Sequence, residues 1–291
     1  MQPFIQLDMQ LGESPRWNPK EQLWYWVDIL GGCLYRADNN GQNLETQSLD
    51  FLPACFFFTE NNQIIVTSNN GIFQLTEFGA EPKQLKSAHD FGLKHRFNDG
   101  VTTPDGHFIA GTISNGQCAD GCSYLGRIEP NGELTTQKIA GGYQIINGQA
   151  FSPDGETYYV ADSPSSQVWQ YKYDKQSSTL RDGRLFYQFE IGVEFPDGAA
   201  VDSQGNYWVA LYGSGKIAVI SPAGERLKDI ECPVSQPTMM AFGGKNNQEL
   251  LITSARQHLD KSTLVNEPFA GSLFKINAET EGLTNGFIKA V

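Results

Sequence analysis

The sequence predicts an all-β fold, and within that class a six-bladed β-propeller. Short apolar strands recur at nearly regular intervals, a turn precedes each of them, and long helical patterns are hard to find. One residue marks the same strand in each repeat: Trp24, Ile64, Phe108, Tyr158, Trp208 and Leu251. The steps between these markers are 40, 44, 50, 50 and 43 residues, the length of one four-stranded blade. Six such units fill residues 1–291 without a linker, so we expect a single domain.

Two strands can be placed in every repeat. The strands that follow the turns are expected at Leu23–Ile29, Gln63–Thr67, His107–Thr112, Thr157–Ala161, Asn206–Leu211 and Glu249–Thr253. A further strand follows each of them, at Gly32–Ala37, Gly71–Leu75, Leu125–Ile128, Gln167–Tyr173, Lys216–Ile220 and Ser272–Ile276. Apolar and polar residues alternate plainly in the segment from Gln167 to Tyr173, as expected of a half-exposed strand.

Turn chemistry supports the same division of the chain. Pro104-Asp105-Gly106 and Pro153-Asp154-Gly155 combine a proline that presets φ with a glycine that accepts a positive φ. The best candidate for a helix is the short segment Asp260–Asn266. A propeller also needs a last outer strand that closes the ring, and either Phe4–Leu7 or Phe287–Val291 could supply it.

Composition narrows the classes of partner. The formal net charge is −12, which argues against nucleic acid and anionic membranes because both require a basic surface. The first ten residues lack the basic and apolar parts of a secretory signal or a membrane span. Five cysteines are an odd number without a CxxC pair, so we expect reduced thiols in a cytoplasmic protein, and assign no role to Cys118 and Cys122. We expect a monomer or a weak homo-oligomer.

A ring of polar side chains emerges when the repeats are aligned. Six residues before the first position of each turn stand Glu13, Asn98, Asn147 and Asp197. The other two repeats have Pro53 and Thr238 in the corresponding place. The first strand of every blade lines the central channel, so an equal offset places these residues at one level and on one face.

The residue types in this ring predict a metal site in the central channel. Asn and Asp before Gly are ordinary turn formers, but Glu13 has no such explanation, and four oxygen donors share one register. Two carboxylates in a narrow channel would repel each other unless a cation lay between them. All-oxygen ligation suits one divalent ion such as Ca²⁺, Mg²⁺ or Mn²⁺, with Zn²⁺ also possible.

Competing catalytic motifs are missing from the sequence. It contains no Gly-x-Ser-x-Gly elbow, Walker loop, His-Glu-x-x-His motif or dinucleotide fingerprint. The four histidines fall in no ligand spacing, and we interpret them as surface or strand-edge residues: His89, His95, His107 and His258.

These residues resemble the gluconolactonase/regucalcin family, also called the senescence-marker-protein family, which includes luciferin-regenerating enzyme. The matching segments are Leu11–Trp17, Trp24–Ile29, Arg96–Gly100, Asn147–Gly148, Pro196–Gly198, Ala241–Gly244 and Thr253–Arg256. The resemblance runs from about residue 11 to residue 276 in the right order. It implies a six-bladed propeller with one catalytic divalent metal. It also implies that the protein hydrolyses sugar-acid lactones. The first motif has Ser14 where the family commonly has glycine.

The resemblance also implies roles for individual residues. Glu13, Asn147 and Asp197 would be the metal ligands, and Asp197 would also be the catalytic acid/base. Arg96 and Asn98 would bind substrate hydroxyls or the lactone oxygen. Some relatives place an acidic substrate contact after a Gly-Thr pair, whereas this chain has Ser114-Asn115-Gly116 there, so Asn115 or Asp120 is expected to contribute to substrate preference.

The expected reaction is metal-assisted hydrolysis of an aldonolactone to the aldonic acid, as a step of carbohydrate catabolism. Two alternatives stay open. One is another esterase on the same scaffold, acting on aryl esters or organophosphates, against which the polar Arg96 argues mildly. The other is a propeller that binds calcium without catalysing a reaction, which would have no need for a carboxylate–amide ring in its channel. The sequence leaves open whether Asp197 is ligand, base or both.

Overall fold

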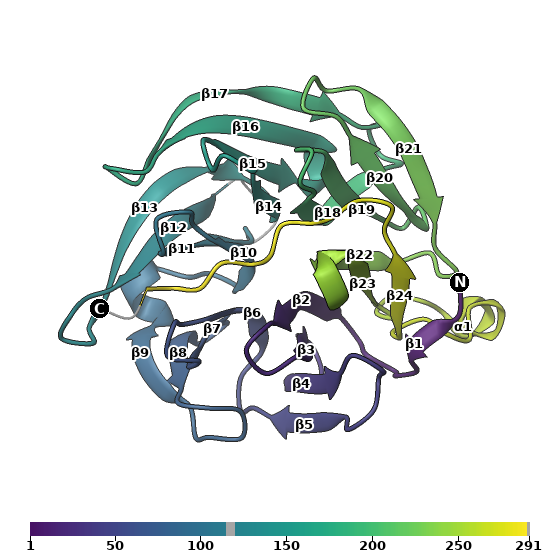
Figure 1. The fold of residues 1–291 in the computed structure, drawn as a ribbon, viewed down its shortest axis with the longest axis horizontal. Coiled ribbons are helices and arrows are strands. Elements are labelled where there is room, and N and C mark those ends of the chain that lie inside the picture. The colour runs from purple at the N-terminus through teal and green to yellow at the C-terminus, as the bar shows by residue number, and fades with distance from the viewer. Residues whose placement is uncertain (115–119, 290–291) are drawn as a thin grey trace.

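The computed structural model describes residues 1–114 and 120–289, and shows six four-stranded antiparallel sheets around a central channel (Figure 1). The first three sheets to follow the N-terminal strand have these strands: β2 (Gly12–Asn18), β3 (Leu23–Asp28), β4 (Cys33–Asp38), β5 (Glu45–Ser48); β6 (Pro53–Phe58), β7 (Ile64–Ser68), β8 (Gly71–Leu75), β9 (Lys83–Ser87); β10 (Phe97–Thr102), β11 (Phe108–Thr112), β12 (Gly121–Ile128), β13 (Leu134–Tyr143). The prediction of an all-β six-bladed propeller is therefore confirmed.

The other three sheets contain these strands: β14 (Ile146–Phe151), β15 (Thr157–Asp162), β16 (Gln167–Asp174), β17 (Thr179–Gln188); β18 (Phe195–Val201), β19 (Tyr207–Tyr212), β20 (Lys216–Ile220), β21 (Arg226–Glu231); β22 (Pro237–Gly243), β23 (Glu249–Ser254), β24 (Leu273–Asn277), β1 (Pro3–Ile5). The two strands predicted for each repeat are the second and third strands of its blade. The short helices are η1 (Ala88–Phe91), η2 (Ser163–Ser165), η3 (Lys245–Asn247) and α1 (Lys261–Asn266). Asp260 caps α1 through a bond from the Thr263 backbone N–H, at the predicted helix.

The ring is closed by the N-terminal strand. β1 pairs antiparallel with β24 as the outer strand of the last blade, with Pro3 opposite Phe274 and Ile5 opposite Leu273. Of the two predicted closures, the N-terminal one is therefore correct. Pairing of the N-terminal strand with the last blade leaves no gap in the ring.

The C-terminal segment, residues 279–289, has a different role, and we call it the strap. It runs across the middle of the ring, as the yellow trace in Figure 1 shows. Backbone bonds attach it to separate blades, through Leu283 N to Val201 O (3.1 Å), Ile288 N to Phe58 O (2.8 Å) and Lys289 N to Gly106 O (2.9 Å). Val201 and its counterparts end the innermost strands, so the strap covers the end of the channel opposite to the strand starts.

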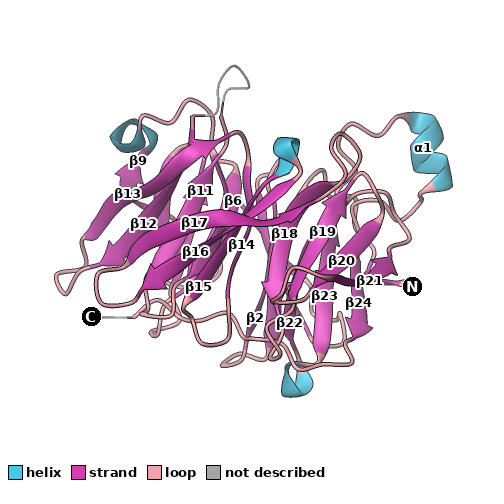
Figure 2. Cartoon of the chain, turned by 90° about the horizontal axis from the view of Figure 1, so that it is seen from above, coloured by secondary structure: helices cyan, strands magenta, loops and turns pink. Residues whose placement is uncertain are grey.

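Apolar side chains fill the space between neighbouring blades. Phe57 of the second blade stacks on Phe108 of the third at 4.7 Å between ring centroids. Trp208 packs edge to face against Phe242 between the fifth and sixth blades, at 5.5 Å between ring centroids. β6 and β14 are buried along their whole length, as expected of innermost strands that are covered on both faces. Seen from the side, α1 lies beyond one end of the sheets (Figure 2).

Within the described residues, no helix is both long and apolar enough to cross a membrane. The four described cysteines are free thiols: Cys33, Cys55, Cys122 and Cys232. Cys118 lies outside the described residues.

Candidate active site and metal centre

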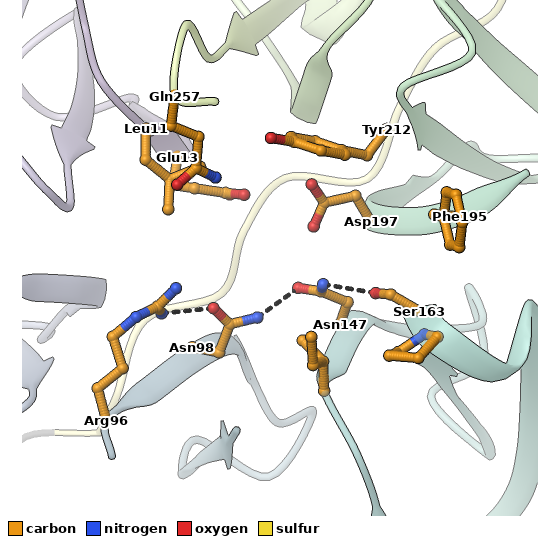
Figure 3. Close-up of a pocket in the computed structure, with 12 residues that line it drawn as sticks. Leu11, Glu13, Arg96, Asn98, Asn147, Ser163, Phe195, Asp197, Tyr212 and Gln257 are labelled. Carbon is orange, nitrogen blue, oxygen red and sulfur yellow. Dashed lines mark hydrogen bonds between the residues drawn. The ribbon is translucent and has the colours of Figure 1, made fainter. Parts of the chain in front are cut away.

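A pocket of about 360 Å³ opens at the end of the channel where the innermost strands begin (Figure 3). Its lining residues come from five of the six blades and the loops between them: Leu11, Glu13, Arg96, Asn98, Ile145, Asn147, Ser163, Pro164, Phe195, Asp197, Tyr212 and Gln257. The predicted residues Glu13, Arg96, Asn98, Asn147 and Asp197 are all in this group, whereas Asp120 is not. The ring that was inferred from sequence spacing is thus a real spatial cluster.

A backbone irregularity aims the ring residues into the channel. Each innermost strand starts in register with its neighbour and then shifts register beside the ring position, for example between Glu13 and Arg16 in β2 and between Asn147 and Ala150 in β14. The same shift occurs in the other four innermost strands, β6, β10, β18 and β22. A bulge bends the strand and re-aims its side chain. In four of the six strands the side chain beside this shift, Glu13, Asn98, Asn147 or Asp197, lines the pocket.

One side of the pocket is a continuous hydrogen-bond chain. Arg96 donates through Nη1 to Asn98 Oδ1 (2.5 Å), and Asn98 Nδ2 donates to Asn147 Oδ1 (2.7 Å). Asn147 Nδ2 in turn donates to Ser163 Oγ (2.8 Å), and Ser163 donates to the Pro196 carbonyl (2.7 Å). These hydrogen bonds fix the side-chain amides of Asn98 and Asn147 in one orientation each. Asn147 therefore keeps a lone pair of Oδ1 free for a further partner.

Asp197 is buried and Glu13 is partly buried in the same pocket, where the two carboxylates repel each other. Burial raises the pKa of Glu13 from 4.5 to about 8, and the negative charge of Asp99 adds to the rise, while the Ser14 N–H and Arg96 oppose it. Burial likewise raises the pKa of Asp197 well above its ordinary value of 3.8. The negative charges of Glu13 and Asp99 raise this pKa further. A cation between the two carboxylates would remove the repulsion that these shifts express.

The donor set fits a hard divalent ion. Glu13 and Asp197 supply carboxylate oxygens and Asn147 an oriented amide oxygen, and few protein ligands leave positions for water and substrate. Among the residues that the structure describes, no three His, Cys, Asp or Glu side chains are arranged so that they could hold a metal ion. A cation here would therefore rely on an amide oxygen beside two carboxylates.

The two ring positions without a carboxylate or amide behave differently. Thr238 donates its hydroxyl to the Gly12 carbonyl (2.5 Å) and also contacts the Thr253 hydroxyl (2.8 Å), so it joins the last blade to the first. Pro53 begins β6 and lies outside the pocket lining. Neither lines the candidate site.

Two predicted substrate contacts follow β11 in the sequence. Asn115, predicted to contact substrate, lies outside the described residues. Asp120 is described, and its carboxylate pairs with Lys94 at 3.0 Å instead of lining the pocket.

Several pocket residues were not predicted from the sequence. Ser163 and Pro164 form η2, Tyr212 ends β19, and Gln257 follows β23. All of them lie at or after the second strand of a blade, where the chain turns over the pocket. Applying the same register count to the ends of the second strands would have found Tyr212, because the Phe195–Tyr212 pair is in register.

The sequence matches known proteins along most of its length. Residues 11–256 match the family described as the SMP-30/Gluconolactonase/LRE-like region. The chain is 36% identical over 275 residues to 6-deoxy-6-sulfogluconolactonase of Pseudomonas putida, covering 94% of this chain and 92% of that protein. It is 29% identical over 274 residues to regucalcin of Gallus gallus, covering 92% and 90%.

Solved structures share the fold. A calcium-binding regucalcin from Agrobacterium tumefaciens has a TM-score of 0.91 at 24% identity and covers 98% of this chain and 96% of its own. A gluconolactonase from Xanthomonas campestris has a TM-score of 0.73 at 20% identity, covering 94% and 88%. The activities named among these relatives include lactone hydrolysis, in agreement with the predicted enzyme class. From the match over residues 11–256 and the 36% identity, the chain belongs to the SMP-30/gluconolactonase/LRE-like family.

Proposed function

We propose that the protein hydrolyses a sugar-acid lactone to its open-chain acid, using one divalent metal ion held by Glu13, Asn147 and Asp197. The observation that carries this proposal is the pocket itself. It places two mutually repelling carboxylates, Asp197 and the partly buried Glu13, beside an oriented amide, at the mouth of a channel that is covered at its other end. A cytoplasmic enzyme of carbohydrate catabolism is consistent with this chemistry.

The chemistry needs polarisation of the lactone carbonyl and a base for the attacking water. When bound, the metal ion would polarise the carbonyl and stabilise negative charge on its oxygen. Asp197 would accept a proton from water as the water oxygen attacks the carbonyl carbon. It would then return the proton to the ring oxygen as the ring C–O bond breaks. The released acid ionises, so each turnover yields one carboxylate and one proton.

Arg96 and Asn98 would position the substrate. Arg96 is 9% exposed, and its guanidinium is the only positive charge among the described lining residues. Its hydrogen bond to Asn98 places both side chains on one side of the carboxylates (Figure 3). Charge-assisted hydrogen bonds from Arg96 and neutral ones from Asn98 would hold the hydroxyls of a sugar lactone. Asn115 is proposed as a further contact on the basis of the sequence resemblance alone.

A panel of lactones with and without metal tests the proposal. The protein is stripped with EDTA, and acid release is measured from glucono-, galactono-, xylono- and arabinonolactone and from 6-deoxy-6-sulfogluconolactone. Ca²⁺, Zn²⁺, Mn²⁺ or Mg²⁺ is then added back singly. We expect loss of activity with EDTA and recovery with at least one ion. No hydrolysis of any lactone alongside tight metal binding would favour a calcium-binding propeller without catalysis, a reading that the calcium-binding structural relative motivates. Hydrolysis of aryl esters or organophosphates instead of lactones would favour the other esterase.

A further inference from the structure

The pocket has a second polar side that the proposed chemistry does not use. Tyr212 and Gln257 lie across the carboxylates from Arg96, Asn98 and Asn147 (Figure 3). Tyr212 extends over Asp197, with its hydroxyl directed towards the side of Glu13 and Gln257. A sugar lactone bound with its carbonyl at the carboxylates would therefore meet polar groups on both sides.

A buried glutamine holds these two residues in place. Gln236 is 7% exposed and lies just before β22. In the amide orientation that satisfies its neighbours, its nitrogen reaches the carbonyls of Gln257 (3.1 Å) and Ala255 (3.3 Å), and its oxygen lies 3.1 Å from the Tyr212 hydroxyl. The backbone N–H of Gln257 also donates to the Gln10 carbonyl (3.0 Å). Gln257 is thus fixed through its backbone, and its side-chain amide lies beside the Tyr212 hydroxyl in the pocket lining.

The hydrogen-bond inventory decides what Tyr212 offers a ligand. The Gln236 nitrogen lies within reach of three acceptors, the Gln257 and Ala255 carbonyls and the Tyr212 oxygen (3.2 Å). When its two hydrogens go to the two carbonyls, its oxygen is the partner for the Tyr212 O–H. A hydroxyl that already donates to a buried amide presents its lone pairs to any other partner. Tyr212 therefore faces the pocket as an acceptor, and Gln257 adds an amide that can both donate and accept.

We infer that Tyr212 and Gln257, positioned by Gln236, recognise hydroxyl groups of the lactone on the side away from Arg96. They thereby make the site selective for polyhydroxylated lactones. This inference rests on the proposed function for its substrate and names residues of the same pocket. A site that is built to hydrogen-bond a hydroxyl discriminates against the analogue that lacks it, because its polar groups are then left without partners.

The test compares two six-membered lactones, glucono-1,5-lactone and δ-valerolactone, which has no hydroxyls. The selectivity is the ratio of their kcat/KM values. We expect Tyr212→Phe and Gln257→Leu each to reduce this ratio roughly 2- to 13-fold, the range for one neutral hydrogen bond. Tyr187→Phe is the matched control, because Tyr187 lies on the outer strand β17 and packs beside Phe189. Mn²⁺ affinity and the melting temperature are measured for each variant, so that loss of the fold is recognised.

An unchanged selectivity ratio in both variants, with folding intact, would overturn the inference. Failure of the proposed function has a different signature, because the unaltered protein would then hydrolyse neither lactone. In that case binding of gluconate by calorimetry decides the matter. Weaker binding in Tyr212→Phe than in Tyr187→Phe supports recognition of hydroxyls, and equal binding overturns it.

Discussion

The charge of Asp99, which lies outside the pocket lining, acts on the two pocket carboxylates Glu13 and Asp197. Asp99 accepts the backbone N–H groups of Gly100 (2.7 Å) and Gln149 (2.9 Å), yet burial still raises its pKa from 3.8 to about 6. Its charge raises the pKa of both Glu13 and Asp197. Without a cation, folding therefore brings together groups that each favour the protonated form.

The raised pKa of Glu13 predicts a pH dependence of stability for the metal-free protein. The pKa is about 8 in the folded protein and 4.5 ordinarily, so the folded state keeps a proton that the unfolded chain has released. Stability from this group is present below about pH 4.5 and is lost as the pH rises towards 8, at up to about 1.4 kcal/mol per pH unit. Glu13→Gln removes the titration. We expect wild type to lose stability relative to this variant between pH 5 and 8, measured by urea unfolding in EDTA.

Metal should reverse this trend. An ion bound to Glu13 displaces the proton, so its stabilisation grows with pH across the same window. Parallel stability curves for wild type and Glu13→Gln, without metal, would contradict the account of the Glu13 carboxyl.

At the scale of single residues, the sequence predicted the ring but not the opposite wall. Glu13, Asn98, Asn147 and Asp197 sit on strands at a constant offset from a turn, so counting alone aligns them. Pro53 and Thr238 share that offset, which shows that register fixes position but not chemistry. A register count extended to the second strands would have found Tyr212, which lies opposite Phe195. Gln257 lies in the loop after β23, which no strand periodicity places.

At the scale of elements, the bulges are what turn strands into a site. Gly148 follows Asn147 in β14 with φ of +56°, and Tyr207 donates its hydroxyl to the Gly148 carbonyl (2.7 Å). A Cβ at this position would lie 2.2 Å from the Tyr207 hydroxyl and 3.0 Å from the Asp197 carbonyl. The bulge that aims Asn147 is thus packed directly against the strand that carries Asp197.

Gly148→Ala is expected to destabilise the protein and to weaken metal binding. The clash should cost about 1–3 kcal/mol beyond the cost of a positive φ, and should displace Asn147 from the ring. Chemical denaturation and Mn²⁺ titration measure the two effects. Gly142→Ala is the control, because Gly142 also has a positive φ, of +94°, but has nothing within 4 Å of the added Cβ. Similar losses of stability and Mn²⁺ affinity in the two variants would show that the positive φ, and not the clash, causes the effect.

The second and third strands of each blade could be predicted because alternation and turns are local signals. The closing strand could not be chosen, since both chain ends carry a short apolar segment. The structure selects Pro3–Ile5, which pairs along an exposed edge of β24, whereas the C-terminal segment crosses the channel instead.

At the scale of the whole molecule, the strap makes the channel a pocket with one entrance. A small cavity of about 90 Å³ remains between the innermost strands and residues 283–286 of the strap. Gly282 joins the strap to the fifth blade through a bridge to Asp202. A Cβ on Gly282 would lie 1.8 Å from Phe242, so the strap fits only because this residue has no side chain.

Gly282→Ala should therefore lift part of the strap and lower stability by about 1–3 kcal/mol, as measured by urea unfolding. Gly286→Ala is a control within the same segment, because its Cβ would meet Thr102 at an ordinary 3.4 Å. If the two variants were equally stable, close packing of the strap at Gly282 would not contribute to the fold.

We propose that Asp197 is both a metal ligand and the catalytic base, while Glu13 is a ligand only. The most direct test is the rate of gluconolactone hydrolysis at saturating Mn²⁺ for Glu13→Gln and Asp197→Asn, each of which keeps an oxygen donor. We expect weaker Mn²⁺ binding in both variants and a largely restored rate of hydrolysis in Glu13→Gln. We expect a rate at least roughly 100-fold below wild type in Asp197→Asn, because general-base catalysis contributes about 10²–10⁴-fold. A near-normal rate in Asp197→Asn at saturating metal would contradict this proposal.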